Sequence, residues 1–198
     1  MTEVLPFSSA AERNADPIAQ KLTELLPEEP ARILEIGSGT GQHVAFFAER
    51  FPEWTFQPSD RNNEYFDAIR QRISNSGNVS SPLVLDLLSP PPMEPDSFDY
   101  IIAINVFQVA PIEVVEALYK LGESSLRPGG KVVTYSPLTH QGRHTSEGDA
   151  AFDERLRERD PKLGIRSIEK LRACAERSGF ANFEEHPMPA NNWLTVAS

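Results

Sequence analysis

The sequence predicts an α/β fold, a doubly wound and mostly parallel sheet with helices on both faces. Segments with the apolar pattern of buried strands alternate with segments of helical periodicity along the chain, and such alternation is typical of parallel sheets. Residues 33–36 carry the apolar run expected of a buried parallel strand. They lead into a turn that contains Gly37, Gly39 and Gly41, and then into an amphipathic helix. Glycines at these positions permit a tight bend and a close approach of the backbone to a ligand.

The other elements follow the same alternation. Pro17 after Asp16 predicts a helix start, because Asp is a good N-cap and proline fits the first helical position. Gly179 predicts the end of a later helix, because glycine favours the left-handed backbone beyond a helix. We expect seven strands, over residues 33–36, 55–58, 82–85, 98–104, 131–135, 183–187 and 193–197, the last two forming a hairpin that makes the final strand antiparallel. We expect helices from 17, from 42, near 66–73, from 111, near 149–160 and near 167–178, a turn over 126–130 and a polar loop over 136–148.

Composition limits the class of protein. The chain of 198 residues has the length of one α/β domain. Its formal net charge of −10 argues against a nucleic-acid partner. A single cysteine, Cys174, excludes a disulfide framework and favours a cytoplasmic location. Residues 1–15 lack the apolar run of a secretory signal, and we expect no membrane span. The oligomeric state stays open.

The spacing of the glycine turn distinguishes between ligands. The dinucleotide fingerprint G-x-G-x-x-G requires a glycine where Gln42 stands. The observed pattern, with Glu35 two residues before Gly37, instead resembles motif I of S-adenosylmethionine (SAM) dependent methyltransferases. SAM has no pyrophosphate, so the loop has only to let an amino-acid group and a ribose lie close to the backbone. The alternative is a glycine-rich turn that binds nothing.

Polar residues end the next three predicted strands, where open α/β sheets bind their ligands. Asp60 stands about 20 residues beyond the glycine turn, the distance at which an acidic residue meets ribose hydroxyls. Asp86 is expected to accept a hydrogen bond from the adenine amino group, and Asn105 to lie beside the methyl group. Alternatively, Asp60 is an ordinary acidic turn residue, Asp86 is a capping residue, and Asn105 is a turn residue whose side chain bonds to its own backbone.

Candidate catalytic residues follow the fifth predicted strand. They are Tyr135, His140, Arg143 and His144, together with Asn105. A histidine in this loop is a plausible general base, since imidazole titrates near neutrality, and Arg143 can bind an anionic group. The alternatives are a solvated loop and a pairing of Arg143 with an acidic neighbour. We predict no metal site, because glycine separates the two histidines and the other two histidines lie far away in sequence.

Further residues are assigned to the substrate side. They are Arg13, Asn14, Phe107, Gln108, Asn191 and Asn192. The first two are expected to fold over the cofactor from just before the first helix, or to belong to a loose tail. The last two either point their amides into the site or only shape the hairpin turn. No Pro-Pro-aromatic sequence follows Asn105. This sequence marks enzymes that methylate a nitrogen of glutamine, adenine or cytosine, so its absence argues against these acceptors.

The whole chain resembles a group of uncharacterised SAM-dependent methyltransferases known as domain of unknown function 938, which is similar to methyltransferase-like protein 26. The matching stretches are 9–14, 17–18, 34–43, 57–60, 85–86, Asn105 with 110–111, 126–130, 142–145, 151–153, 159–161 and 188–192. The chain departs from this group at Gln108 and Ile112, where relatives often carry histidine and tryptophan. The resemblance implies the fold and the cofactor but no substrate.

The sequence therefore predicts a single Rossmann-like class I methyltransferase domain over 1–198 that acts on a small molecule. Residues 1–30 form an N-terminal lid and helix, 31–135 the SAM-binding half, and 136–198 the substrate-side loops, helices and final hairpin. The predicted cofactor set is Glu35, Gly37, Ser38, Gly39, Gly41, Gln42, Asp60, Arg61, Asp86, Leu87 and Asn105. SAM is the cofactor and S-adenosylhomocysteine (SAH) the product. The alternatives are a non-catalytic SAM-binding or interaction protein and, less favoured, an NAD-dependent oxidoreductase.

Overall fold

A computed structural model describes residues 5–27 and 29–198 of the chain. The chain divides into two compact units, residues 1–86 and residues 87–198. In the described part of the chain, no helix is long and apolar enough to cross a bilayer. The prediction of one domain over the full length stays a prediction.

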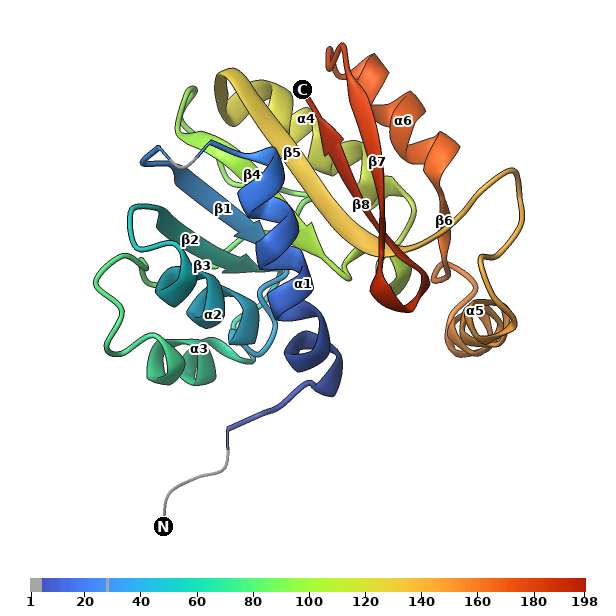
Figure 1. Cartoon of the computed structure of the whole chain (residues 1–198), viewed down its shortest axis with the longest axis horizontal. Helices are drawn as coiled ribbons and strands as arrows, with labels where there is room; N and C mark the ends of the chain where they lie inside the picture. Colours follow the sequence, from blue (N-terminus) through green and yellow to red (C-terminus); the bar gives the residue numbers. More distant parts are fainter. Residues whose placement is uncertain (1–4, 28) are drawn as a thin grey trace. The chain divides into compact units, whose positions relative to one another are not determined.

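The first unit has a three-stranded parallel sheet. Its elements are α1 (Ser9–Leu25), β1 (Arg32–Ile36), α2 (Gln42–Arg50), β2 (Thr55–Asp60), α3 (Phe66–Arg72) and β3 (Leu83–Val84). The strands lie in the order β3-β2-β1, and each neighbouring pair is parallel. Helices α1 and α3 both pack against α2 (Figure 1). The carboxyl ends of β1 and β2 therefore lie at one edge of this sheet, and the glycine turn leaves from that edge.

Helix α1 begins earlier than we predicted. It starts at Ser9, with Ser8 as its N-cap, and the Ser8 hydroxyl accepts a hydrogen bond from the backbone N–H of Ala11. Pro17 lies inside the helix and is not its first residue, so the predicted start at Pro17, with Asp16 as N-cap, is wrong. Proline removes one backbone donor within a helix, but the cap and the buried face of α1 stabilise the turns before it. Residues 1–4 of the predicted lid lie outside the described residues.

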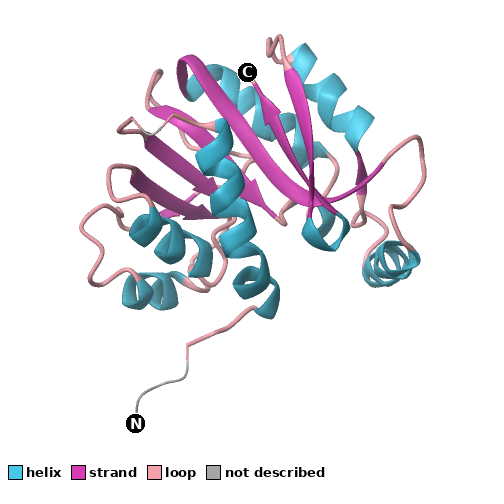
Figure 2. Cartoon of the chain, in the orientation of Figure 1, coloured by secondary structure: helices cyan, strands magenta, loops and turns pink. Residues whose placement is uncertain are grey.

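The second unit combines parallel and antiparallel strands. Its elements are β4 (Phe98–Ile104), η1 (Phe107–Val109), α4 (Glu113–Ser125), β5 (Leu126–Thr139), α5 (Glu147–Arg159), β6 (Arg166–Ser167), α6 (Ile168–Arg177), β7 (Phe183–Met188), η2 (Pro189–Asn191) and β8 (Asn192–Ala197). Strand β5 is parallel to β4 and β6 and antiparallel to β8, and β7 pairs antiparallel with β8. Figure 2 shows β5 as a long curved strand with the final hairpin beside it. The α/β prediction and the antiparallel final strand are confirmed.

Two predictions about β5 are wrong. The strand begins at Leu126 and not at 131, so the predicted turn over 126–130 is part of it. In the pairing of β5 with β4, Leu126 lies opposite Phe98, whereas Lys131 lies opposite Tyr100. Strand β5 therefore has extra residues between these two pairs. This irregular register accommodates the Pro-Gly-Gly segment that we had predicted as a turn. The strand also extends to Thr139, into the predicted loop, and there it pairs with β6.

The remaining elements agree closely with the predictions. Two-residue β6 was not predicted, so the described residues contain eight strands where we expected seven. Helices α5 and α6 lie within two residues of their predicted bounds, and both begin with a serine cap. Gly179 has φ +83° and follows α6 as predicted. Local capping signals located these helix ends, whereas the strand errors depend on pairing between distant segments.

Gly41→Ala tests the packing of the glycine turn in the first unit. Gly41 has φ +78°, and a Cβ there would lie 2.9 Å from Cγ1 of Ile69 in α3. Gly39 has φ +51°, and a Cβ there would meet only the carbonyl oxygen of Gly37, 3.9 Å away. Both variants incur about 1 kcal/mol of left-handed backbone strain, and Gly41→Ala adds overpacking of about 1–3 kcal/mol.

Urea denaturation followed by circular dichroism measures both losses. We expect Gly41→Ala to lose clearly more stability than the matched variant Gly39→Ala. Equal losses would mean that Ile69 yields to the added methyl group and that Gly41 is not required for packing.

Candidate functional site

The turn after β1 is fixed by reciprocal hydrogen bonds to the end of β2. The backbone N–H of Ser38 donates to the carbonyl of Ser59 at 2.9 Å, and the N–H of Ser59 donates to the Ser38 hydroxyl at 3.1 Å. The Ser59 hydroxyl in turn donates to the carbonyl of Glu35 at 2.7 Å. Gly37 and Gly39 on either side of Ser38 have positive φ, as the alternating glycine pattern requires. The turn thus has a backbone that most other residues adopt only with strain.

Asp60 lies directly beside this turn. Its Oδ2 accepts a hydrogen bond from the backbone N–H of Gly39 at 3.0 Å. The side chain is half-buried, and the Asp60 carbonyl accepts from the N–H of Leu85 at 2.8 Å, which joins β2 to the segment after β3. The structure therefore brings together two parts of the predicted cofactor set, the glycine turn and the acidic residue at the end of β2.

Glu35 is a buried acid next to the same turn. Its residue is 4% exposed, and Oε2 has no hydrogen-bond partner among the described residues. Burial raises the pKa of Glu35 to about 7, with a hydrogen bond from Ser38 opposing the rise and the charge of Asp60 adding to it. Glu35 stands near the end of β1, and its unpartnered oxygen is unusual because buried polar groups are normally satisfied.

Gln42 holds the N-terminal segment on the turn. Its Oε1 accepts from the backbone N–H of Ser8 at 2.6 Å and from the Thr40 hydroxyl at 2.9 Å, while its Nε2 donates to the Ser8 carbonyl at 3.2 Å. Arg72 of α3 donates to the carbonyls of Thr40 and Pro6. Gln42, which stands where the dinucleotide fingerprint has its third glycine, therefore uses its side chain to bond to the protein backbone. Its assignment to the cofactor stays a prediction.

Arg13 and Asn14, which we expect from the sequence to fold over the cofactor from just before the first helix, both lie inside α1. Asn14 is buried, and its Oδ1 lies 2.6 Å from Nε2 of His43, whose ring stacks on Phe47 at 5.7 Å. Burial lowers the pKa of His43 to about 4, so the ring stays neutral near pH 7 and pairs with the amide. Arg13, the neighbouring residue in α1, is exposed. The Asn14–His43 pair connects α1 to α2.

The three predicted residues that follow β2 and β3 differ in exposure. Arg61 and Asp86 are exposed, whereas Leu87 is 7% exposed. Asp86 ends the first unit and Leu87 begins the second. Their cofactor roles remain predictions.

In the second unit, Asn105 ends β4 in a strained conformation. It has φ +56°, which is uncommon for a residue other than glycine. Its backbone N–H donates to the Tyr135 carbonyl at 2.7 Å, and its Oδ1 accepts from Nε2 of Gln108 at 3.2 Å. Left-handed residues at the ends of strands often mark functional sites. The structure thus joins Asn105, Gln108 and Tyr135, which sequence reasoning placed in the catalytic and substrate-side sets.

A group of buried polar atoms without partners lies close to these residues. Among the described residues, no hydrogen bond is made by Gln108 Oε1, Ser136 Oγ, His140 Nε2 or Trp193 Nε1. Ser136 and Trp193 are register partners on β5 and β8, and the His140 ring lies 4.2 Å from the Trp193 ring. Sequence reasoning missed Ser136 and Trp193, because only the pairing of β5 with β8 brings them together.

Residues 140–143 form a tight turn. The backbones of His140 and Arg143 exchange hydrogen bonds at 3.0 and 2.9 Å, and Gln141 and Gly142 both have positive φ. These are the features of a type I′ hairpin turn. The Arg143 side chain is exposed. This segment is therefore a defined turn, as the glycine between the two histidines had suggested, and not a helix.

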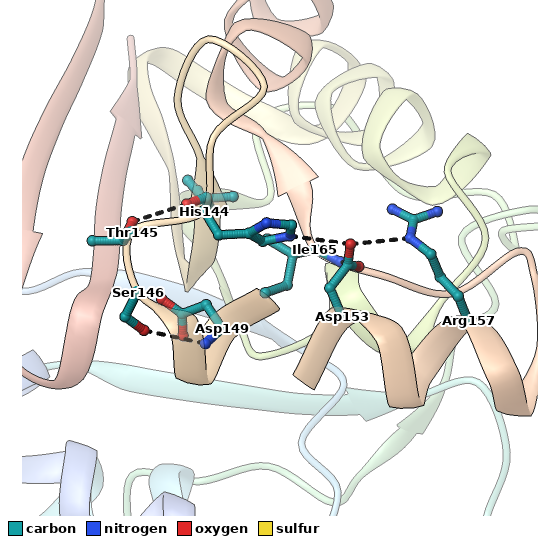
Figure 3. Close-up of polar contacts among 8 residues, drawn as sticks. His144, Thr145, Ser146, Asp149, Asp153, Arg157 and Ile165 are labelled. Carbon is teal, nitrogen blue, oxygen red and sulfur yellow. Dashed lines mark hydrogen bonds and ion pairs between the residues drawn. The ribbon is translucent and has the colours of Figure 1, made fainter. Parts of the chain in front are cut away.

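His144 contacts a residue that sequence reasoning had not selected. Its Nε2 lies 3.1 Å from Oδ2 of Asp153 in α5. The same oxygen accepts from Nε of Arg157 at 3.0 Å, and Asp153 Oδ1 accepts from the backbone N–H of Ile165 at 2.6 Å. Figure 3 shows the carboxylate between the imidazole and the guanidinium. Asp153 and Arg157 are four residues apart on one helix, a spacing at which oppositely charged side chains pair.

The two remaining substrate-side asparagines lie at the tip of the final hairpin. Asn192 Nδ2 donates to the carbonyls of Pro189 and Ala190 at 3.2 and 3.1 Å. Ala190 and Asn191 both have positive φ. The alternative in which Asn192 shapes the turn is therefore the one observed. Phe107, also assigned to the substrate side, is buried in η1 and its carbonyl accepts from Arg166 at 3.0 Å.

No group of three or more His, Cys, Asp or Glu side chains within residues 5–27 and 29–198 is arranged to hold a metal ion.

The fold is that of a class of known enzymes, the SAM-dependent methyltransferases. The chain is similar to an O-methyltransferase family protein from Burkholderia thailandensis, with a TM-score of 0.79 and 17% identity over 96% of this chain and 58% of that one. It is also similar to an O-methyltransferase family 2 protein from Planctomyces limnophilus in complex with apigenin, with a TM-score of 0.76 and 17% identity over 96% and 59%. A third neighbour is human N-acetylserotonin methyltransferase in complex with SAM, with a TM-score of 0.75 and 16% identity over 93% and 51%. The chain spans little more than half the length of these proteins.

The family is established by a match over nearly the whole chain. Residues 5–197 match the model described as "Protein of unknown function (DUF938)". The chain belongs to this family, which confirms that part of the predicted resemblance.

Glu35→Gln tests the buried acid. The folded-state pKa of about 7 lies above the ordinary value of 4.5, so the folded chain holds a proton that the unfolded chain releases. Stability linked to Glu35 is therefore complete at low pH and is lost as pH rises from about 4.5 to 7. Since Gln mimics the protonated acid, we expect the variant to match the wild type near pH 4.5 and to exceed it by up to about 3 kcal/mol near pH 8.

Urea unfolding of both proteins across this pH range measures the difference. His43 titrates in both chains, so its contribution cancels. A stability difference that does not change with pH would contradict the raised pKa of Glu35.

Proposed function

We propose that the chain is a class I SAM-dependent methyltransferase that acts on a small-molecule acceptor. The observation that carries the proposal is the contact between Asp60 and the turn after β1. The Asp60 carboxylate lies 3.0 Å from the backbone nitrogen of Gly39, and it would accept hydrogen bonds from both ribose hydroxyls of an adenosine ligand. The fold shared with SAM-dependent methyltransferases supports the same class of enzyme.

The residues of the turn fit such a ligand. Gly39 leaves open space where a side chain would stand, whereas the corresponding space at Gly41 is filled by Ile69. Gly39 would therefore admit the ligand to the backbone, and Gly41 would set the packing of α2 on α3. The unpartnered Oε2 of Glu35 would accept a hydrogen bond from the amino-acid part of the ligand or from water. Ser38 would hold the loop in register with β2.

For the methyl acceptor, we propose a set of binding residues within the second unit. SAM, when bound, supplies a methyl group already activated by its sulfonium. The main task of the protein is then orientation, which can supply roughly 7–11 kcal/mol of a barrier. The unpartnered polar atoms of Gln108, Ser136, His140 and Trp193 support an acceptor that is small and offers hydrogen bonds. Asn105, Tyr135, Arg143 and His144 remain the candidate catalytic residues.

The predictions about nucleic-acid binding, cellular location and the similarity to methyltransferase-like protein 26 are also part of this proposal. The net charge of −10 supports the absence of a nucleic-acid partner, and the single cysteine supports a cytoplasmic location. The similarity to methyltransferase-like protein 26 rests on the sequence stretches alone.

Asp60→Asn tests the ribose assignment. Hydrogen bonds to a charged group contribute about 1.5–3 kcal/mol each, so we expect SAH to bind roughly 10- to 100-fold more weakly. Calorimetric titration of the full chain measures the affinity. Asp67→Asn is the matched control, because Asp67 is an exposed acid in the same unit that only pairs with Arg70. An unchanged affinity in Asp60→Asn would refute the ribose assignment.

The same titration separates the alternative functions. Binding of NAD without binding of SAM or SAH would refute the proposal and favour an oxidoreductase. Tight SAM binding without transfer to any acceptor of a broad panel would favour a non-catalytic SAM-binding protein.

A further inference from the structure

Two of the stretches that resemble the family, residues 142–145 and 151–153, meet at the contact between His144 and Asp153. We infer that these residues form an acid–base pair, in which Asp153 positions His144. Asp153 would hold the imidazole in the tautomer protonated on Nε2, and Nδ1 would take a proton from the methyl acceptor. The inference rests on the proposed methyltransferase function, and it narrows the acceptor to molecules whose nucleophile begins as an O–H or N–H group.

The surroundings of Asp153 fix its protonation state. The residue is 8% exposed and accepts from Arg157, from the backbone N–H of Ile165 and from His144 (Figure 3). Burial alone would raise the pKa of Asp153, but these hydrogen bonds outweigh it, and the pKa is lowered. An ionised carboxylate can only accept hydrogen bonds. The His144 nitrogen that faces it must therefore carry the proton.

The geometry of the contact between His144 and Asp153 depends on a glycine. Gly164 has φ +133°, and a Cβ there would lie 2.6 Å from Oδ1 of Asp153. Only glycine lets the following N–H reach the carboxylate. On the other side, the Thr145 hydroxyl donates to the Leu138 carbonyl at 3.3 Å, and the Ser146 hydroxyl accepts from the N–H of Asp149 at 3.1 Å (Figure 3). The segment that carries His144 is thus held to both β5 and α5.

The pair lies on the side of the second unit where a ligand is expected. The N–H of Gly164 donates to the Gln108 carbonyl at 3.0 Å, and the Gln108 side chain donates to Asn105 at the carboxyl end of β4. Ligands of open α/β sheets bind at these ends. The His144 side chain is 28% exposed and that of Asp153 only 11%. A reachable imidazole oriented by a buried carboxylate is the arrangement of a general base and its positioning residue.

The proposed step transfers a methyl group from sulfur to the acceptor and a proton from the acceptor to His144. The acceptor oxygen or nitrogen forms a bond to the methyl carbon, the carbon–sulfur bond breaks with its electron pair going to sulfur, and the acceptor proton passes to Nδ1 of His144. The imidazolium then returns the proton to water. A positioned base of this kind contributes typically 10²- to 10⁴-fold to a rate.

The tautomer of His144 is the first test. Long-range ¹H–¹⁵N spectra of the full chain distinguish the two neutral forms, and the variants His144→Gln and His144→Glu assign the His144 signals among the four histidines. At about pH 8.5, where free imidazole is neutral, we expect Nε2–H in the wild type and a loss of that preference in Asp153→Asn. Asp149→Asn, the matched control on α5, should leave the spectrum unchanged. Protonation on Nδ1 in the wild type would overturn the inference whether or not Asp153→Asn folds.

The rate of SAH formation is the second test. With SAM and a panel of small phenols, alcohols and amines, we expect His144→Gln to lower the rate roughly 100-fold or more while the calorimetric affinity for SAH is unchanged. A purely structural role would instead lower thermal stability and leave the rate of the folded enzyme intact. A wild type that binds SAH but methylates no member of the panel would also overturn the inference. If SAH does not bind at all, the proposed function is refuted. The tautomer of His144 then still tests whether Asp153 orients the imidazole.

Discussion

The first unit depends on the left-handed backbone of the turn that follows β1. Gly37, Gly39 and Gly41 all have positive φ, and Ser38 between them is bonded in both directions to Ser59 at the end of β2. This one constraint places the N–H of Gly39 against Asp60, sets the start of α2 and brings α2 against α3. The same turn anchors the N-terminal segment through the side chain of Gln42. Loop, acid and helix are therefore positioned together.

The second unit uses buried hydrogen bonds for a similar purpose. Arg166 is 7% exposed and donates to the carbonyls of Phe107, Ala110 and Lys162. With the carboxylate of Asp153, it holds η1, α5 and the segment before β6 in one arrangement. Buried polar groups stabilise a structure only when they are satisfied. Several buried polar atoms of this unit have no partner among the described residues, and those of Gln108, Ser136, His140 and Trp193 lie near Asn105, where we propose that the acceptor binds.

The parts of the fold that local chemistry encodes could be predicted from the sequence. The strand, glycine turn and helix at 33–50, the Gly179 helix end and the final hairpin each have a signal within a few residues, and all were found. Pro17 misled the prediction of α1, because proline marks a helix start in isolation but is tolerated inside a helix that is capped and packed elsewhere. The Pro-Gly-Gly segment within β5 misled the prediction in the same way, because an irregular pairing with β4 absorbs it.

The residues of the candidate site likewise divide into those that a local sequence pattern predicts and those that only long-range packing brings together. Asp60 could be predicted because its distance along the chain from the glycine turn is characteristic, and the structure does place it beside Gly39. The pairing of His144 with Asp153 could not, because their contact also requires the N–H of Ile165 and the absence of a side chain at Gly164. Ser136 and Trp193 meet only through the register of β5 and β8. Groups that long-range packing brings together leave no local pattern to read.

We propose that the glycine turn and Asp60 bind the adenosine part of SAM, and a crystal structure of the chain with SAH is the decisive measurement. We expect electron density for the ligand over the turn of residues 37–41, with both ribose hydroxyls within hydrogen-bond distance of the Asp60 carboxylate. Ligand density elsewhere, or a ribose that does not contact Asp60, would contradict it.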